Sequence, residues 1–263
     1  MPPAFDHAIV VVSSLPESVN SFERAGFTVT PGGKHDAVPT ENALVCFADG
    51  GYLELLATRD RETRTELRRL RATERWELHV RGVSAVARRF LPLLAGPDGV
   101  ADWVLRSESI ARAAARLRRC GVAASGPVDM SRERPDGERI AWQLLLPESS
   151  LHPFRIADRT PRERRVPVEP AAVTHANGAS GVSVVHVRAP VVPVAALELG
   201  DTLGVVPAVG AAGTSVLELG GWRAELSAGR PAGAFALGLA GVHSLPDDIV
   251  ALGVLADGNM APR

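Results

Sequence analysis

Several features are scarce or missing in this sequence of 263 residues, and each absence excludes a class of protein. It has only two cysteines, Cys46 and Cys120, which are far apart and lie in apolar segments, so we expect reduced thiols and not a disulfide framework. No stretch approaches the roughly 20 apolar residues that span a bilayer, and no apolar run follows a basic N-terminal region. We therefore expect a cytoplasmic protein without a membrane segment.

The sequence also has no excess of charge of one sign, and it lacks the motifs of nucleotide chemistry. The net charge is -1, so no basic field attracts nucleic acid. There is no Gly-rich phosphate loop, Rossmann fingerprint, nucleophile elbow or paired CxxC motif. These absences predict a small-molecule partner and no nucleotide cofactor. Lys34 is the only lysine beside 28 arginines, a codon bias typical of a GC-rich, actinobacterial genome.

The residues that are present begin with a strand, a helix and three more strands. His7 lies in the first of these strands and Glu54 in the last, each inside an apolar run where an unpaired polar group is costly to bury. The predicted elements are a strand at 6–12, a helix at 16–25, a short strand at 27–30 with a turn at 32–33, and strands at 42–47 and 52–56. This first module covers residues 4–58.

A second module of the same order follows a helical insert at residues 59–99. Its predicted elements are a strand at 101–106, a helix from Ser107 or Ser109 to about 119, a loop at 126–137, and strands at 139–146 and 152–157. Counting from the glycines that close the two helices places Trp103 near the position of His7 and Arg155 near that of Glu54. The second module therefore supplies no ligand at the two usual positions.

The C-terminal part begins the pattern a third time. We expect a strand at 182–188, a helix at 194–203 and a hairpin of 214–219 with 222–228, then a partial fourth unit with a strand at 234–242 and a weak helix at 247–255. His186 and Glu225 correspond poorly to His7 and Glu54, so a second metal site is not expected. The predicted domains are 1–160, with modules 4–58 and 100–158, and 171–263.

This β-α-β-β-β order resembles the half-barrel module of the vicinal oxygen chelate superfamily, which includes glyoxalase I, extradiol dioxygenases and bleomycin-resistance proteins. The stretch DHAIVVVSSL…FERAGFTVTPGGKH…ENALVCFADGGYLELLA, residues 6–57, is similar to the glyoxalase-like domain proteins. The resemblance implies an α+β fold in which paired βαβββ modules form a curved half-barrel or barrel sheet with flanking helices. It also implies a cavity with metal ligands on the first and last strands.

His7 and Glu54 are the first candidates for chemistry. Imidazole and carboxylate groups suit Zn, Fe, Mn or Ni, although a catalytic metal usually has three protein ligands. The alternative is a buried His–Glu hydrogen bond that braces the sheet and leaves an acid–base pair. Burial beside Leu53 and Leu55 should raise the pKa of Glu54 unless a metal or a cation holds its charge. His35 is a third ligand, a general base, a substrate donor or a solvated turn residue.

The closing strand of the second module leaves two alternatives that differ by one residue in register. In one register His152 points inward and completes a metal set with His7 and Glu54. In the other register Arg155 points inward and holds a carboxylate or an enolate through paired donors.

The remaining candidates are three residues that could contact a substrate. Asn42 is either such a contact or a turn cap. Trp103 and Trp142 are either aromatic walls for a planar ligand or core residues.

Two functions of different classes follow. One is a glyoxalase-like enzyme, an isomerase, lyase or dioxygenase, in which Glu54, His7 and His35 are catalytic and act on a small oxygen-rich molecule with or without one divalent metal ion. The other is a metal-free binding protein of the drug-sequestering kind, in which the modules form only an apolar cup. The chain is expected to be a monomer or a homodimer.

Overall fold

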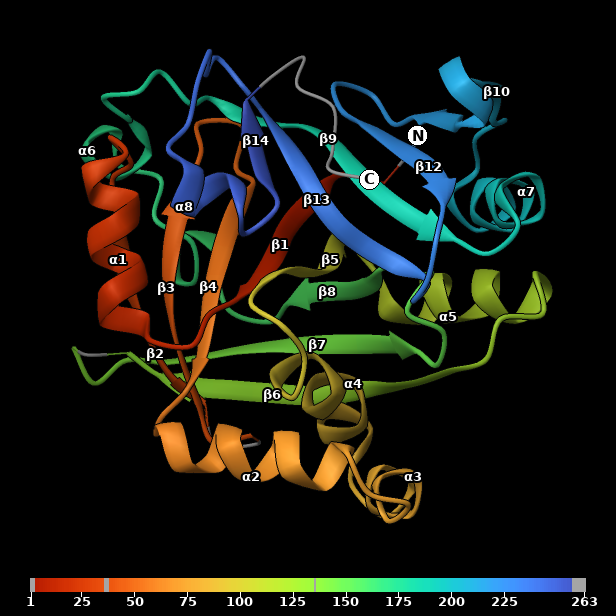
Figure 1. Ribbon diagram of the computed structural model, residues 1–263, viewed down its shortest axis with the longest axis horizontal. Helices are drawn as coiled ribbons and strands as arrows, with labels where there is room; N and C mark the ends of the chain where they lie inside the picture. Colours follow the sequence, from red (N-terminus) through yellow and green to blue (C-terminus); the bar gives the residue numbers. More distant parts are fainter. Residues whose placement is uncertain (1–2, 36–37, 135, 257–263) are drawn as a thin grey trace.

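Two mixed β-sheets and their flanking helices form the protein in the computed structural model, which describes residues 3–35, 38–134 and 136–256 (Figure 1). The first module consists of β1 (Phe5–Val11), α1 (Leu15–Arg24), β2 (Thr30–His35), β3 (Thr40–Cys46) and β4 (Tyr52–Thr58). The second consists of β5 (Gly99–Arg106), α5 (Ile110–Arg119), β6 (Ala124–Glu133), β7 (Arg139–Pro147) and β8 (Phe154–Asp158). The predicted order of elements and the α+β class are confirmed.

The two modules share one curved sheet with the strand order β2-β3-β4-β1-β5-β8-β7-β6. Strand β1 lies at its centre and pairs in parallel with β4 and antiparallel with β5. His7 is opposite Tyr52 in one pair and opposite Val104 in the other. Because side chains alternate along a strand, His7, Ile9 and Val11 share one face of β1, and Ala8 and Val10 share the other.

The helix boundaries follow signals that the sequence contains. The Ser14 hydroxyl accepts a hydrogen bond from the backbone N–H of Glu17 at the start of α1, and Ser109 caps α5 in the same way through Arg112. Gly121 follows α5 with a φ of 74°, a left-handed conformation that ends a helix at little cost for glycine.

Two local predictions need correction. The second strand of the first module runs over Thr30–His35 and not over 27–30, so the predicted turn at 32–33 lies inside β2. The region 126–137, expected as a loop, contributes most of β6. In both places the sequence is rich in Gly, Pro or charge, which favours loops locally, but pairing with β3 and β7 holds the backbone extended.

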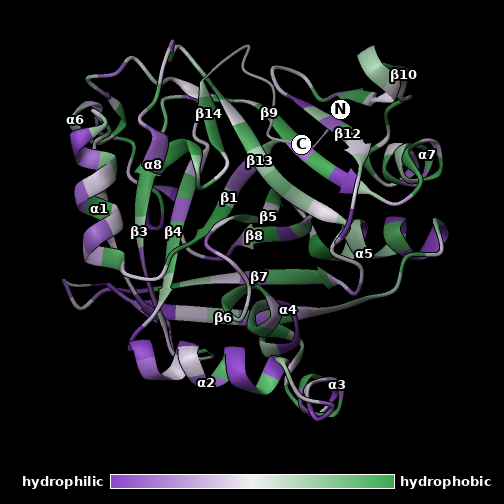
Figure 2. Ribbon diagram, in the orientation of Figure 1, coloured by the Kyte–Doolittle hydropathy of each residue, from purple (hydrophilic) through white to green (hydrophobic). Residues whose placement is uncertain are grey.

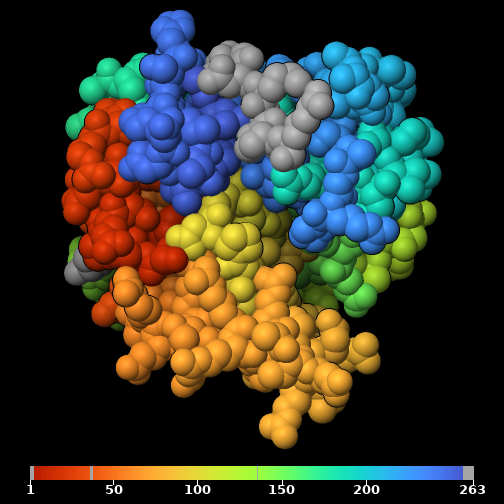
Figure 3. Space-filling model, viewed as in Figure 1, coloured from red at the N-terminus to blue at the C-terminus, as the bar shows by residue number. Residues whose placement is uncertain are grey.

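The segment between the modules folds into α2 (Arg61–Arg71), α3 (Trp76–Arg81) and α4 (Ala85–Leu94). These helices lie along one side of the first sheet, and α2 is coloured mainly hydrophilic in Figure 2. In the space-filling view α2 and α3 form the projection at the lower edge (Figure 3). The buried side chains of α4, which include Val86 and Leu94, pack on the concave side of the sheet with Ile9 and Val104.

The C-terminal part forms a second sheet with the order β10-β11-β12-β9-β13-β14. Its elements are β9 (Gly181–Ala189), α7 (Val192–Leu203), β10 (Ala208–Val209), β11 (Ser215–Glu218), β12 (Arg223–Ala228), β13 (Gly233–Ala240), α8 (Asp247–Val250) and β14 (Val254–Ala256); a 3₁₀ turn at Arg162–Arg164 and α6 (Pro170–Val173) connect the sheets. The helix expected at 247–255 thus ends early and gives way to β14.

The main core lies between the two sheets. It joins the convex face of the first sheet, for example Val10 and Trp103, to Val185 and Leu237 of the second. The division into domains at 1–160 and 171–263 stays a prediction, and residues 1–2 and 257–263 of those ranges lie outside the described residues. None of the helices in the described ranges is long and apolar enough to cross a membrane.

Candidate functional site

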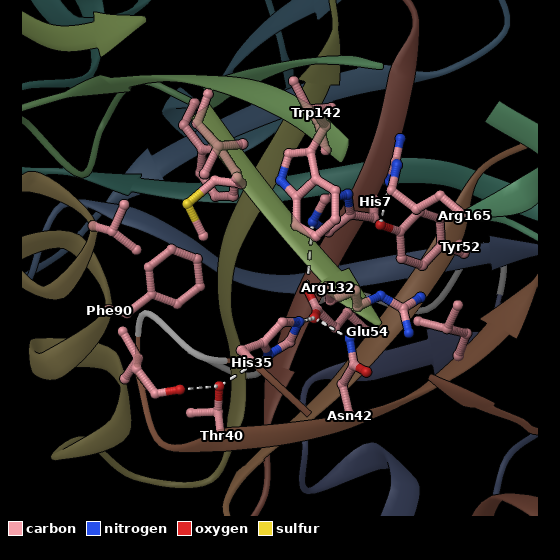
Figure 4. A pocket seen from close by; sticks show the side chains of 17 residues that line it. His7, His35, Thr40, Asn42, Tyr52, Glu54, Phe90, Arg132, Trp142 and Arg165 are labelled. Atoms are coloured by element: carbon pink, nitrogen blue, oxygen red, sulfur yellow. Dashed lines mark hydrogen bonds and ion pairs between the residues drawn. The ribbon is translucent and has the colours of Figure 1, made fainter. Parts of the chain in front are cut away.

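A cavity lies on the concave side of the first sheet, under α4 (Figure 4). The space that atoms leave unfilled there is about 660 Å³, a volume that includes the part open to solvent. Its polar side chains come from β1, β2, β3, β4, β6 and the segment that joins the two sheets, and they are His7, His35, Thr40, Asn42, Tyr52, Glu54, Arg132 and Arg165. Its apolar wall consists of Val86, Phe90, Met130, Trp142, Leu144, Phe154 and Ile156.

Glu54 is the carboxylate at the centre of the polar side. Its Oε2 atom lies 3.4 Å from Nε2 of His7, and its Oε1 atom accepts a hydrogen bond from Nδ2 of Asn42. The Nε2 atom of His35 lies 3.9 Å from Oε1. His7 and Asn42 meet Glu54 because β1 and β3 are the two neighbours of β4 in the sheet, and His35 comes from β2, the next strand beyond β3. The carboxylate therefore has partners on both oxygens although only 8% of the residue is exposed.

The neighbours of Glu54 stabilise the charged form of its carboxylate. Burial alone would raise its pKa, but the hydrogen bond and the charge of His7, with His35 and Asn42, lower the pKa to about 2. The side chain is therefore ionised at neutral pH. The sequence predicted a raised pKa unless a metal or a cationic partner held the charge, and the contact with His7 lowers the pKa of Glu54 here.

His7 lies between two carboxylates. Its Nδ1 atom donates to Oδ1 of Asp6 at 2.8 Å, and its ring stacks on Tyr52 with centroids 4.5 Å apart. Burial would lower its pKa, but the contacts with Asp6 and Glu54 outweigh burial and raise it. The register of β1 against β5 shifts between Phe5 and His7, and such a bulge lets adjacent side chains approach one another.

Asp6 is in turn surrounded by arginines from the connector between the sheets. Its two oxygens accept hydrogen bonds from Nη1 and Nη2 of Arg165, each at 3.2 Å, and Oδ2 also accepts from Arg162. Although burial would raise the pKa of Asp6, the charges of Arg165, His7 and Arg162 hold it well below its usual range. Arg165 also donates to the hydroxyl of Tyr52 at 2.7 Å. The pair His7–Glu54 is therefore supported from behind by a buried network.

The structure brings five of the predicted site residues together in this cavity: His7, His35, Asn42, Glu54 and Trp142. His35 is the last residue of β2, and its Nδ1 atom is 2.9 Å from the hydroxyl of Thr40. It is therefore a strand residue that lines the cavity and not part of a loop.

Two predicted contacts lie on the other face of the sheet. Trp103 is fully buried in the core between the sheets, where its ring meets Trp222 edge-on at 5.9 Å. Arg155 alternates with Phe154 and Ile156, which point into the cavity, and so it points away from it, toward α5. The predicted correspondence of Trp103 with His7 and of Arg155 with Glu54 was thus wrong by one residue. A shift of one residue exchanges the two faces of a strand.

His152 does not reach the cavity either. It precedes β8, and its Nε2 atom lies 2.8 Å from Oε1 of Glu198 on α7. The metal set of His7, Glu54 and His152 is corrected accordingly, because the side chain of His152 is buried against the second sheet's helix. Burial lowers its pKa although Glu198 raises it.

The residues that sequence analysis missed are Asp6, Arg132 and Arg165. Asp6 directly precedes His7, and an acidic residue beside a buried histidine is a signal that sequence alone offers. Arg132 and Arg165 lie among many arginines in stretches expected as loop and connector, where nothing local distinguishes them.

The donor atoms of the site do not fit a complete metal centre. Among the described residues, no group of three or more His, Cys, Asp or Glu side chains could hold a metal ion. At the inward positions of the second module stand Val104, Phe154 and Ile156, which have no coordinating atom. His7 and Glu54 alone are fewer than the three protein ligands of a usual catalytic zinc site.

Residues 5–203 of the chain match the family model described as "Glyoxalase-like domain". The chain therefore belongs to the glyoxalase-like domain family, which is part of the vicinal oxygen chelate superfamily, and the resemblance seen in the sequence is confirmed. Members of this superfamily are often enzymes. No curated protein matches the sequence.

Solved structures are similar at low sequence identity. A hypothetical protein from Staphylococcus aureus is 17% identical, with a TM-score of 0.68 over 90% of each chain. A mutant of 4-hydroxymandelate synthase from Streptomyces coelicolor is 14% identical, with a TM-score of 0.51 over 91% of this chain and 71% of that one. The Mn(II)-bound glyoxalase from Novosphingobium aromaticivorans is 10% identical, with a TM-score of 0.49 over 90% and 65%. The first two likenesses show the fold alone, and the third is too distant for an argument.

Proposed function

We propose that this protein is an enzyme of the isomerase or lyase type that moves a proton on a small oxygen-bearing molecule. One observation carries the proposal: the carboxylate of Glu54 and the imidazole of His7 meet at 3.4 Å in a cavity whose opposite wall is apolar. A base and an acid that face one cavity are the two groups that general acid–base catalysis requires.

In the free protein Glu54 is a weak base, because His7 lowers its pKa to about 2 after burial has acted to raise it. A ligand oxygen that accepts the Nε2–H of His7 would take the place of Glu54 in that contact. The pKa of Glu54 would then rise, since burial favours the neutral form of a carboxyl group. Ligand binding itself would thus turn Glu54 into a stronger base.

The proton would come from a carbon next to the ligand's carbonyl group. Glu54 takes this proton, the electron pair of the C–H bond forms a C=C bond, and the carbonyl oxygen becomes an enolate that His7 stabilises through Nε2. Return of the proton to the same or a neighbouring carbon gives an isomer, and loss of a leaving group gives a lyase product. His35, with Nε2 at 3.9 Å from Glu54, is the second group placed to exchange the proton.

A metal-free binding protein is the second candidate, and the apolar wall favours it. The second module contributes Val104, Phe154 and Ile156 at its inward positions, which is the composition of a hydrophobic cup. Dioxygenase activity and a metal ion on His7 and Glu54 stay predictions, and metal analysis of protein purified without chelators tests both.

The substitution Glu54→Gln separates the two candidates because it keeps the shape of the side chain and removes its charge. We would incubate the protein in D₂O with a panel of small carbonyl compounds and follow loss of the C–H signal by NMR. The enzyme should accelerate exchange on at least one compound, and Glu54→Gln should abolish that acceleration. Glu41→Gln, on the neighbouring strand and outside the cavity lining, is the matched control.

Exchange that proceeds equally in the Glu54→Gln variant would contradict the catalytic role. No exchange on any compound, together with tight ligand binding that Glu54→Gln barely changes, would support the binding protein instead.

A further inference from the structure

Arg132 is a buried cation in the cavity, and the described part of the chain gives it no ion-pair counter-ion. It lies on β6, only 5% of the residue is exposed, and it is one of the residues that line the cavity of Glu54 (Figure 4). Its Nη1 atom donates a hydrogen bond to the carbonyl oxygen of Gly32 on β2, across the edge where the curved sheet nearly closes. Among the described residues it has no ion-pair partner. A guanidinium group has five N–H donors, so most of them remain for a ligand.

Three other buried arginines each form an ion pair with an aspartate. Arg64 pairs with Asp98 at 2.7 Å, Arg89 with Asp102 at 2.7 Å, and Arg165 with Asp158 at 2.6 Å. A buried charge without such a partner is costly. Arg132 and Arg155 are the two exceptions within the described ranges, and of the two only Arg132 borders a cavity that can admit an anion.

Burial lowers the pKa of Arg132, and Glu54 is near enough for its charge to raise it, but the two side chains form no ion pair. The oxygens of Glu54 face His7, His35 and Asn42 instead. The positive charge of Arg132 is therefore still available when the charge of Glu54 has been matched by His7.

We propose that the cavity binds a small carboxylic acid with an apolar, planar body, and that Arg132 selects it by holding the carboxylate. A planar guanidinium group matches a carboxylate through paired hydrogen bonds. With the carboxylate at Arg132, the apolar body would contact the aromatic wall formed by Phe90, Trp142 and Phe154. The carbon next to the carboxylate would then be on the side of Glu54.

This inference rests on the proposed function for the reaction, but the binding can be measured without turnover. Phenylacetate and phenylacetamide have nearly the same shape and differ in charge, so we would titrate each into the protein by calorimetry. The protein should bind phenylacetate at least about tenfold more tightly than the amide, a difference of about 1.4 kcal/mol.

Variants of Arg132 locate the source of this preference. Arg132→Met should remove the preference for phenylacetate over phenylacetamide. Arg132→Lys should keep part of this preference, because the charge remains but the planar guanidinium group is lost. Arg155→Met is the matched control, since it also removes a buried arginine without an ion pair among the described residues but lies outside the cavity. It should leave the preference for phenylacetate unchanged. If Arg132→Met fails to fold, the comparison of acid and amide in the native protein and in Arg132→Lys still decides.

Three results would overturn the inference: equal affinity for acid and amide, no binding of phenylacetate at millimolar concentration, or a preference that survives Arg132→Met. Glu54→Gln separates this inference from the proposed function. That variant should bind phenylacetate at least as tightly as the native protein while losing exchange activity. If Glu54→Gln keeps both the preference for phenylacetate and the native exchange rate, the catalytic role of Glu54 is refuted and the role of Arg132 in binding is not.

Discussion

His7 and Glu54 lie on neighbouring parallel strands, and Nε2 of His7 is 3.4 Å from Oε2 of Glu54. Glu54 is opposite Ile9 in this register, two residues beyond His7, so both side chains project from the same face of the sheet. The ordinary values of their pKa are 4.5 for Glu and 6.5 for His, and the pair moves them apart.

This pair predicts how stability depends on pH. The pKa of Glu54 falls to about 2 on folding, so its contribution is present above about pH 4.5 and is lost as the pH falls toward 2. The pKa of His7 rises, so its contribution is full below pH 6.5 and is lost as the pH rises through the folded value. The pair should therefore stabilise the protein most between about pH 4.5 and 6.5.

Urea unfolding at a series of pH values measures this dependence. Glu54→Gln should flatten the acid side of the curve, which amounts to roughly 3 kcal/mol at most. A variant with the acid-side slope of the native protein would show that Glu54 is not the group responsible.

Asp6→Asn should lower the pKa of His7, because the carboxylate that receives its Nδ1–H is lost. It should also destabilise the protein by about 3–5 kcal/mol, since Arg165 and Arg162 lose a buried partner. NMR titration of the imidazole signals measures the first effect. Asp158→Asn removes another carboxylate from Arg165 without touching His7, so a fall in the pKa of His7 of equal size in both variants would contradict the role of Asp6.

Gly32→Ala should disturb the site although Gly32 carries no side chain. A Cβ atom there would overlap Oδ1 of Asn42 and lie 2.9 Å from its backbone oxygen, so Asn42 would have to move away from Glu54. We expect a higher pKa for Glu54 and a loss of about 1–3 kcal/mol of stability. Gly82→Ala, where the nearest atom is at 3.5 Å, should be nearly neutral. Carboxyl ¹³C NMR reads the pKa, and an unchanged signal for Glu54 would reject the coupling.

Arg155 and Arg89 should respond in opposite ways to replacement by Met. Arg155 is 5% exposed and has no counter-ion among the described residues, and burial followed by the charge of Arg116 lowers its pKa to about 10. Its removal should leave stability unchanged or raise it by about 1–4 kcal/mol. Arg89→Met leaves Asp102 buried and unpaired and should cost about 3–5 kcal/mol. Denaturant midpoints compare the stabilities of the two variants, and a large loss of stability in Arg155→Met would contradict this prediction.

The sequence by itself determined the order of elements in each module and the strands that hold His7 and Glu54. These features depend on local patterns, such as apolar runs of strand length, caps like Ser14 and Ser109, and the glycines that end helices. Such patterns act over a few residues, and the chain shows them without its tertiary partners.

Only the tertiary structure decided which side chains share the cavity. Pairing of β8 with β5 and β7 sets the face on which Arg155 lies, and a shift of one residue reverses it. Arg132 meets Gly32 across 100 residues of sequence, and Arg165 meets Asp6 across 159. These contacts arise when the curved sheet brings β6 toward β2 and the connector behind β1, because packing of distant elements and not local propensity fixes them.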